Sequence, residues 1–158
     1  MPGLPAAKAL KLCLGRDIPT KIDASDLKLN LDILGYDSGT SVLGLRLDLN
    51  GDGAPESIIQ GASDTCGTGG CPFQIFDGKT KLQVGDFFNA PIFVLDEQIN
   101  GWPVITTWGH SSAASGTYGT WVYDGAAYRA VSGGYLSGEN VTSLSRELYK
   151  SCPLESSE

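Results

Sequence analysis

The sequence predicts a mainly β protein, an antiparallel sheet or sandwich of about eight or nine short strands with a short helix near each terminus. Apolar and polar residues alternate in several short segments, as in strands that bury one face. Gly makes up 21 of the 158 residues, about twice the usual share of roughly 7%, so tight turns are expected between the strands. The length fits one domain. We therefore expect residues 1–158 to form a single globular domain, with fraying at the first few residues and at 153–158.

The helices are expected at the two ends of the chain. Residues 5–14 are rich in helix formers and stop before Gly15, a typical C-terminal cap. Val141, Leu144 and Leu148 follow the i, i+3, i+7 spacing of a helical stripe.

Between these ends the pattern changes to that of strands. Residues 27–33 alternate Leu or Ile with Lys, Asn and Asp, which predicts a half-buried strand, and residues 43–47 alternate in the same way. Asp77-Gly78 and Asp124-Gly125 each follow an apolar run, which predicts tight hairpins because both turn residues can adopt a positive φ. The further strand candidates are residues 57–59, 73–76, 81–84, 92–95, 103–108, 117–123 and 128–131.

The charge balance narrows the classes of partner. The chain has 11 basic and 18 acidic residues, for a net charge of −7. The basic residues are not gathered in one segment, so we expect no binding to nucleic acid or to an anionic membrane surface. We also expect no membrane span, because no apolar run approaches the roughly 18–20 residues that a span needs. An acidic surface instead favours a basic protein partner.

The four cysteines predict disulfides. Cys66 and Cys71 flank a Gly-rich loop that lets their sulfurs meet, and Cys13 and Cys152 lie near chain ends that are often close in a folded domain. We expect the pairs Cys66–Cys71 and Cys13–Cys152, although four cysteines allow three connectivities. A zinc site is a poor fit to the C-x4-C spacing with one distant His. Disulfides imply a periplasmic or extracellular location, with any signal peptide already removed because the first eight residues lack an apolar core.

The acidic segment 48–56 carries the most specific motif. Asp48, Asn50 and Asp52 place oxygen donors at positions 1, 3 and 5, and Gly53 follows at position 6, as in the first half of a calcium loop. An EF-hand also needs a bidentate Glu at position 12, where this chain has Ile59, and the flanking residues look like strands. The segment is therefore not an EF-hand.

Over residues 43–61 the chain resembles the FG-GAP and related extracellular β-repeats, in which D-x-[DN]-x-D-G-x-x-[DE] joins two strands. That resemblance implies Asp48, Asn50, Asp52 and Glu56 as ligands of Ca²⁺. The stretch is also similar to rigid hairpins of small Gram-negative envelope β-proteins. In that interpretation Asp48 and Asn50 accept hydrogen bonds from loop N–H groups and no metal is needed. Both interpretations stay open.

Residues 108–116 contain the single His of the chain and are expected to form an exposed loop or a broad hairpin tip. A serine hydrolase is disfavoured, because adjacent residues in an extended chain point apart and no G-x-S-x-G motif surrounds these serines. The alternatives are a solvated loop beneath two core tryptophans and a recognition loop with hydroxyl groups between aromatic anchors. For the recognition loop, the partner-binding candidates are Trp108, Gly109, His110, Ser111, Ser112 and Ser115.

Together these observations predict a non-enzymatic binding protein. In general type the chain is similar to small periplasmic inhibitors of cell-wall hydrolases, including lysozyme inhibitors and immunity proteins against type VI secreted amidases. We therefore expect an inhibitor or immunity protein that blocks a basic cell-wall hydrolase through an exposed loop such as residues 109–116. The alternatives are a calcium-stabilised adhesion or structural module and, less favoured, a serine-type hydrolase.

Overall fold

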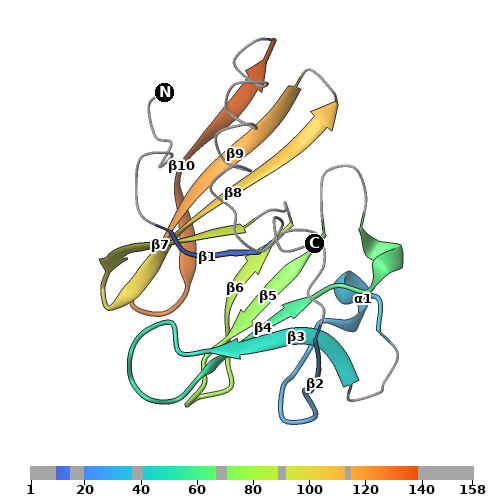
Figure 1. Ribbon diagram of the computed structural model, residues 1–158, viewed down its shortest axis with the longest axis vertical. Coiled ribbons are helices and arrows are strands. Elements are labelled where there is room, and N and C mark those ends of the chain that lie inside the picture. The colour runs from blue at the N-terminus through green and yellow to red at the C-terminus, as the bar shows by residue number, and fades with distance from the viewer. Residues whose placement is uncertain are drawn as a thin grey trace.

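In a computed structural model of the chain, residues 10–14, 20–36, 41–66, 71–88, 92–112 and 115–138 are described. These residues form ten strands in two five-stranded sheets, and every neighbouring pair of strands is antiparallel (Figure 1). The predicted mainly β, antiparallel class is confirmed. No helix in this part of the chain has the length and apolar character needed to cross a membrane.

The first sheet has the strand order β1-β7-β8-β9-β10. Strands β7 to β10 follow one another as hairpins, and β1 joins the outer side of β7. Strand β10 is therefore one edge of this sheet. The strands are β1 (Leu10–Leu14), β7 (Ile92–Ile99), β8 (Trp102–Ser112), β9 (Ser115–Tyr123) and β10 (Tyr128–Ser137).

The second sheet is a meander in which each strand pairs with the next along the chain. A helix of one turn, α1 (Leu31–Leu34), precedes β3, and a short 3₁₀ helix, η1 (Ser63–Thr65), follows β4. The strands are β2 (Lys21–Asp23), β3 (Ser41–Leu47), β4 (Glu56–Gln60), β5 (Phe73–Phe76) and β6 (Gln83–Phe87).

The main core combines residues of both sheets. Ile58, Phe73 and Phe87 come from the second sheet, and Ile105 and Tyr128 come from the first. A smaller cluster lies on the other side of β4 and includes Ile59 together with residues of the α1 region. Strand β4 is therefore buried on both faces along its whole length, which explains why its sequence lacks the alternation expected of a half-buried strand.

The predicted N-terminal helix is wrong over its second half. Residues 10–14 form strand β1, in which Cys13 pairs with Phe93 and Leu14 with Ile92. Helix propensity is a weak preference, and the backbone hydrogen bonds offered by the edge of β7 override it. The first half of that prediction, the predicted C-terminal helix and the frayed segment 153–158 lie outside the described residues.

The predicted strand over residues 27–33 is also wrong. The chain is irregular from Leu27 to Asn30 and then forms α1. Asn30 caps this helix by accepting a hydrogen bond from the Ile33 N–H (3.3 Å), and Gly35 ends it at φ +71°. Of the alternating apolar residues, Leu27 is buried in the smaller cluster and Leu29 packs against it, whereas Leu31 is exposed, so the alternation identified only part of the buried set and not the backbone conformation.

Both Asp-Gly segments connect paired strands, but neither forms the predicted two-residue turn. Residues 77–82 join β5 to β6, and residues 124–127 join β9 to β10. Gly125 has a positive φ of +106°. Gly78 instead lets the backbone of the β3–β4 connection approach closely, since a Cβ on Gly78 would clash with the Ala54 carbonyl oxygen. Strand β6 consequently begins at Gln83, later than predicted.

Candidate functional site

Four hairpin connections lie together on the left and lower left of Figure 1, and we call this region the loop end. Two belong to each sheet, so the loop end spans the whole sandwich. The connections are residues 48–55 between β3 and β4, 77–82 between β5 and β6, 100–101 between β7 and β8, and 124–127 between β9 and β10.

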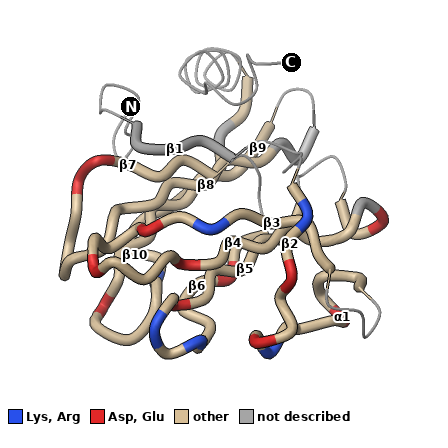
Figure 2. The backbone as a smooth tube through the Cα atoms, turned by 60° about the horizontal axis from the view of Figure 1, so that its bottom comes forward, with Lys and Arg blue, Asp and Glu red and all other residues tan. Residues whose placement is uncertain are grey.

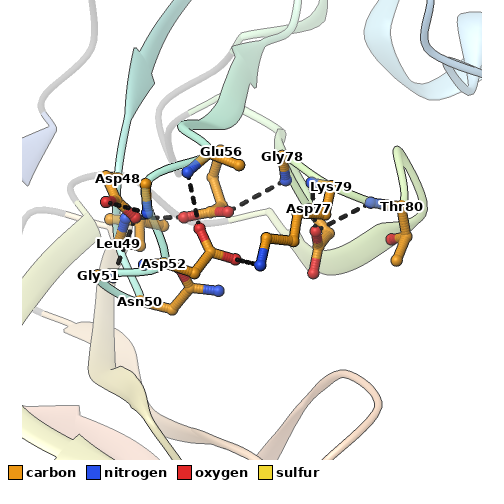
Figure 3. A network of polar contacts seen from close by, with 12 residues as sticks. Asp48, Leu49, Asn50, Gly51, Asp52, Glu56, Asp77, Gly78, Lys79 and Thr80 are labelled. Carbon is orange, nitrogen blue, oxygen red and sulfur yellow. Dashed lines mark hydrogen bonds and ion pairs between the residues drawn. The ribbon is translucent and has the colours of Figure 1, made fainter.

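The β3–β4 connection holds itself in shape through its own side chains (Figure 3). One carboxylate oxygen of Asp48 accepts the Gly51 N–H and the other accepts the Gly53 N–H, both at 2.9 Å. The Asn50 side-chain oxygen accepts the Asp52 N–H at 3.1 Å. Gly51 and Gly53 adopt φ of +75° and +86°, a conformation that favours glycine. The local hydrogen bonds between side chains and backbone therefore hold this loop in one conformation.

Glu56 joins this connection to the next one. Its side chain is fully buried, with one oxygen accepting the Leu49 N–H at 2.7 Å and the other accepting the Gly78 N–H at 3.1 Å (Figure 3). Burial raises the pKa of Glu56 above its ordinary value of 4.5, although these N–H groups oppose the shift. The carboxylate is a bridge between two loops of the second sheet.

The predicted calcium ligands are thus already engaged as hydrogen-bond acceptors. Asp48 and Asn50 bond to loop N–H groups as the metal-free interpretation expects, and Glu56 is turned toward Leu49 and Gly78. Across the described ranges, no group of three or more His, Cys, Asp or Glu side chains is placed to hold a metal ion. Carboxylate oxygens keep further lone pairs, so calcium binding stays a prediction for this loop.

In the first sheet, the β7–β8 and β9–β10 connections are also joined. Asn100 and Gly101 form the β7–β8 turn with φ of +55° and +81°, and the Asn100 side chain donates to the Tyr123 carbonyl at 2.8 Å. Asp124 accepts the N–H groups of Ala127 and Ala126, which lowers the pKa of its carboxyl group. Each connection is again fixed by a short polar side chain.

The two halves of the loop end meet around Tyr123. Its ring stacks on Trp102, with centroids 4.6 Å apart and an interplanar angle of 17°. Partial burial raises the pKa of Tyr123, and the charges of Asp77 and Asp124 raise it further. Because Asp77 belongs to the second sheet and Asp124 to the first, carboxylates from both sheets act on this one phenol.

The loop end is predominantly acidic, and Figure 2 shows Asp and Glu residues spread along it. Its lysines are engaged with carboxylates. Lys79 lies 3.9 Å from Asp52, and Lys81 lies 3.2 Å from Asp26. The acidic residues in or next to the four connections are Asp48, Asp52, Asp77, Asp96, Glu97 and Asp124.

Of the two forms expected for residues 108–116, an exposed loop or a broad hairpin tip, the structure shows a hairpin, and the exposed loop is wrong. Strand β8 continues to Ser112 and β9 begins at Ser115, so the segment is a paired hairpin in which His110 lies opposite Gly116. Trp108, Gly109 and Ser115 are buried. The side chains of His110, Ser111 and Ser112 lie outside the described set. Partner binding by these residues stays a prediction, but they belong to the opposite end of the sheet from the loop end.

Packing against aromatic rings explains the small residues of this hairpin. A Cβ on Gly116 would lie 2.6 Å from the Trp108 ring, and a Cβ on Gly119 would lie 3.0 Å from the Trp121 ring nitrogen. That nitrogen donates to the Thr107 hydroxyl at 3.2 Å. These glycines make room for the indole rings. From its composition alone, a Gly-rich segment that packs against rings looks the same as a flexible loop.

The predicted Cys66–Cys71 disulfide is confirmed, with the two Cα atoms 4.2 Å apart. It closes the connection between η1 and β5, and Cys71 is buried in the main core. The Cys13 side chain and Cys152 lie outside the described residues, so their pairing stays a prediction.

The sequence identified Asp48, Asn50, Asp52 and Glu56 but missed the loop end as a whole. Asn100, Tyr123 and Asp124 reach it only through the pairing of β7 with β8 and of β9 with β10. The available signal was the pair of Asp-Gly segments, which predicted hairpins but not that their turns meet.

No protein-family model, curated protein or solved structure matches the chain significantly.

Proposed function

We propose that the chain is a non-enzymatic binding protein that docks its loop end on a basic protein. One observation carries the proposal: four connections, three of which contain Asp residues, lie side by side; Glu56 joins the two of the second sheet and Asn100 joins the two of the first. Loops on a rigid β scaffold are common sites of recognition.

Rigidity supports binding because association normally requires loops to be ordered. Asp48, Asp77 and Asp124 each accept two backbone N–H groups within their own connection. The connections are therefore already ordered before a partner arrives, which removes part of the entropic penalty of association.

Charge supports a basic partner. The chain carries a net charge of −7, and Lys79 and Lys81 at the loop end are already beside carboxylates. An acidic surface of this kind steers a basic protein into contact and raises the association rate, an effect that salt screens.

The finer proposal is that the partner is a basic cell-wall hydrolase, which the chain inhibits. The Cys66–Cys71 disulfide favours an oxidising compartment such as the periplasm or the exterior. In this proposal the loop end covers the hydrolase cleft, in place of the segment 109–116 that the sequence suggested.

The test is inhibition of lysozyme and of a basic cell-wall amidase, with association rates measured at low and high salt. We expect inhibition of at least one enzyme and an association rate that falls as salt rises. Asp96→Lys, on an exposed residue beside the loop end, should slow association by about tenfold. Asp64→Lys makes the same charge change on an exposed residue of η1 and should have a much smaller effect.

Two outcomes would reject the proposal. One is that neither enzyme is bound or inhibited at any salt concentration. The other is that Asp96→Lys and Asp64→Lys slow association equally, which would show an effect of net charge and not of the loop end.

A calcium-stabilised adhesion or structural module is the second candidate. It is favoured by Asp48, Asn50 and Asp52, whose side-chain oxygens lie in one short loop between two strands. The test is the melting temperature in calcium, in magnesium and in chelator. A site specific to the folded state would stabilise it by about 2.7 kcal/mol at 100 times the dissociation constant. Identical melting temperatures in all three would reject this candidate.

A further inference from the structure

Two aromatic rings and two carboxylates come together where the sheets meet in the loop end. Trp102 belongs to β8, Tyr123 ends β9 and Asp124 follows it, whereas Asp77 begins the β5–β6 connection of the second sheet. The charges of Asp77 and Asp124 both act on the Tyr123 phenol. We call these four residues the Tyr123 site.

Tyr123 is the outer ring of a stack in this site. It lies nearly parallel to Trp102, with ring centroids 4.6 Å apart, and Trp102 is buried whereas Tyr123 is only partly buried. Tyr128 lies 6.0 Å from Tyr123 and 6.1 Å from Trp102 at steep interplanar angles of 72° and 86°. Because it is equally far from both rings, Tyr128 flanks the stack and does not cap it. The Tyr123 ring is therefore fixed by its neighbours and still presents surface to solvent.

The two carboxylates are held in the same way, one in each sheet. Asp77 and Asp124 each begin an Asp-Gly connection, and the Oδ1 atom of each accepts two N–H groups of its own connection (Figure 3 shows those of Asp77). No other described residue donates a hydrogen bond to either Oδ2 atom. These bonds orient both carboxylates and leave one oxygen of each for a partner. The donors, at 2.7–3.1 Å, are Lys79 and Thr80 for Asp77, and Ala126 and Ala127 for Asp124.

The basic residues nearby do not neutralise these carboxylates. Lys79 lies 3.9 Å from Asp52, on the β3–β4 connection. The charge of Arg129 lowers the pKa of Asp124, but less than the N–H groups of its own connection do. Within the described ranges, neither Asp77 nor Asp124 forms an ion pair with a Lys or Arg side chain. The site therefore presents two oriented negative charges beside an aromatic ring.

We propose that the Tyr123 site receives an arginine side chain of a basic protein, with the guanidinium against the Tyr123 ring and its N–H groups donating to Asp77 and Asp124. This inference rests on the proposed function and names the group of the partner that the loop end recognises. Charge complementarity selects a cation, and the ring selects a planar one. A guanidinium stacks on aromatic rings and donates to two acceptors at once, whereas a lysine ammonium is a compact point charge. Trp, Tyr and Arg are also enriched among the residues that dominate binding energy in protein interfaces.

The test is the binding of two small probes, N-acetyl-arginine amide and N-acetyl-lysine amide, to the full chain at low salt. NMR shifts of the Tyr123 ring and the Trp102 indole N–H report occupancy of the site. We expect the arginine probe to bind about threefold or more tightly than the lysine probe. Tyr123→Leu, which removes the ring, should abolish this preference.

Asparagine substitutions test the carboxylates without disturbing the fold. Asp77→Asn and Asp124→Asn each keep an oxygen that can accept the N–H groups of the connection and remove only the charge. Each should weaken the arginine probe by about threefold or more. Asp64→Asn makes the same change on an exposed residue of η1 and should leave the affinity unchanged. Melting temperatures establish that each variant is folded.

Failure of the arginine probe to bind, or equal binding of the two probes, would overturn the inference. It would also be overturned if both asparagine variants of the site bound the arginine probe as tightly as wild type, or if Asp64→Asn weakened it equally. This inference and the proposed function fail separately. If a hydrolase is inhibited and Asp96→Lys slows its association, but the arginine probe does not bind, the proposed function stands and the arginine site is rejected. If the probe binds as expected and neither hydrolase is bound, the arginine site stands and the proposed function is rejected.

Discussion

The glycines of the β3–β4 connection and those of the β8–β9 hairpin serve opposite physical purposes. Gly51 and Gly53 adopt positive φ, and a Cβ on either would meet nothing within 4 Å. At Gly116 and Gly119 a Cβ would instead meet the rings of Trp108 and Trp121. The first pair is needed for its conformation and the second for the space it leaves. Glycine content alone therefore does not indicate a flexible loop.

The two regions also differ in what holds them. The β3–β4 connection depends on hydrogen bonds between residues close in sequence, and Glu56 and the Asp52–Lys79 ion pair tie it to the β5–β6 connection. The β8–β9 hairpin depends on ladder pairing and on buried rings. Substitutions in the two regions should therefore change the free energy of unfolding by different amounts.

The largest expected effect is that of Trp108→Ala. The indole is fully buried over Gly116, so its removal should lower the free energy of unfolding by about 3–5 kcal/mol. Urea denaturation measures this value. In the Trp108→Ala background, Gly116→Ala should be less damaging, because the ring atoms that the new Cβ would meet are gone and only the Gly109 carbonyl oxygen, at 2.7 Å, remains. If Gly116→Ala is equally damaging in both backgrounds, the glycine is not there to accommodate the ring.

Glu56→Ala should come next. It leaves the N–H groups of Leu49 and Gly78 without their carboxylate acceptor, and we expect a loss of about 2–4 kcal/mol. Hydrogen exchange should show faster exchange at both amides. Asp96→Ala removes an exposed carboxylate and is the control. Unchanged exchange at Gly78 would show that Glu56 does not join the two connections.

Asparagine substitutions at glycines should distinguish conformation from space most directly. Asn tolerates positive φ better than most residues, so Gly53→Asn should cost less than about 1 kcal/mol of unfolding free energy. Gly116→Asn would force a side chain into the Trp108 ring and should cost about 1–3 kcal/mol. Thermal denaturation of the two variants makes the comparison. Equal losses would contradict the distinction between the two regions.

The smallest expected effect is the pH dependence at Glu56. Its pKa in the folded protein lies above the ordinary 4.5, so the folded state binds this proton more tightly than the unfolded chain does. The unfavourable contribution of the buried charge is present at neutral pH and is lost as pH falls through the folded-state pKa. Wild type should therefore gain unfolding free energy relative to Glu56→Gln between pH 7 and about pH 4.5.

Denaturant titrations in chelator measure this difference without interference from calcium. The carboxyls of Asp23 and Asp124 have lowered pKa values, but they are present in both proteins, so their contributions cancel. A constant difference across the range would show that Glu56 does not titrate differently in the folded state.

Several strands could be predicted from the local pattern of residues alone. Segments 43–47, 73–76 and 117–123 lie within β3, β5 and β9, and the Cys66–Cys71 pair forms because a short loop brings its sulfurs together. Leu10–Leu14 was misassigned because its structure depends on β7, a distant partner that local propensity does not encode.

Two further errors have equally specific causes. Residues 27–33 became irregular chain and α1 because Asn30 and Gly35 cap a helical turn. For residues 108–116, the hairpin was among the expected forms, but the exposed loop was wrong because small residues there fit against buried indole rings. In the loop end, the sequence predicted three of the four connections but not that they meet, because tertiary contacts bring them together.

The pairing of β1 with β7 has a consequence for the order of folding. The second sheet joins only strands that are consecutive along the chain. In the first sheet, Leu14 of β1 pairs with Ile92 of β7, which lies far away in the sequence. Closing so long a loop is entropically unfavourable and slow. We therefore expect the meander β2–β6 to form early during synthesis and β1 to close the first sheet in a late step.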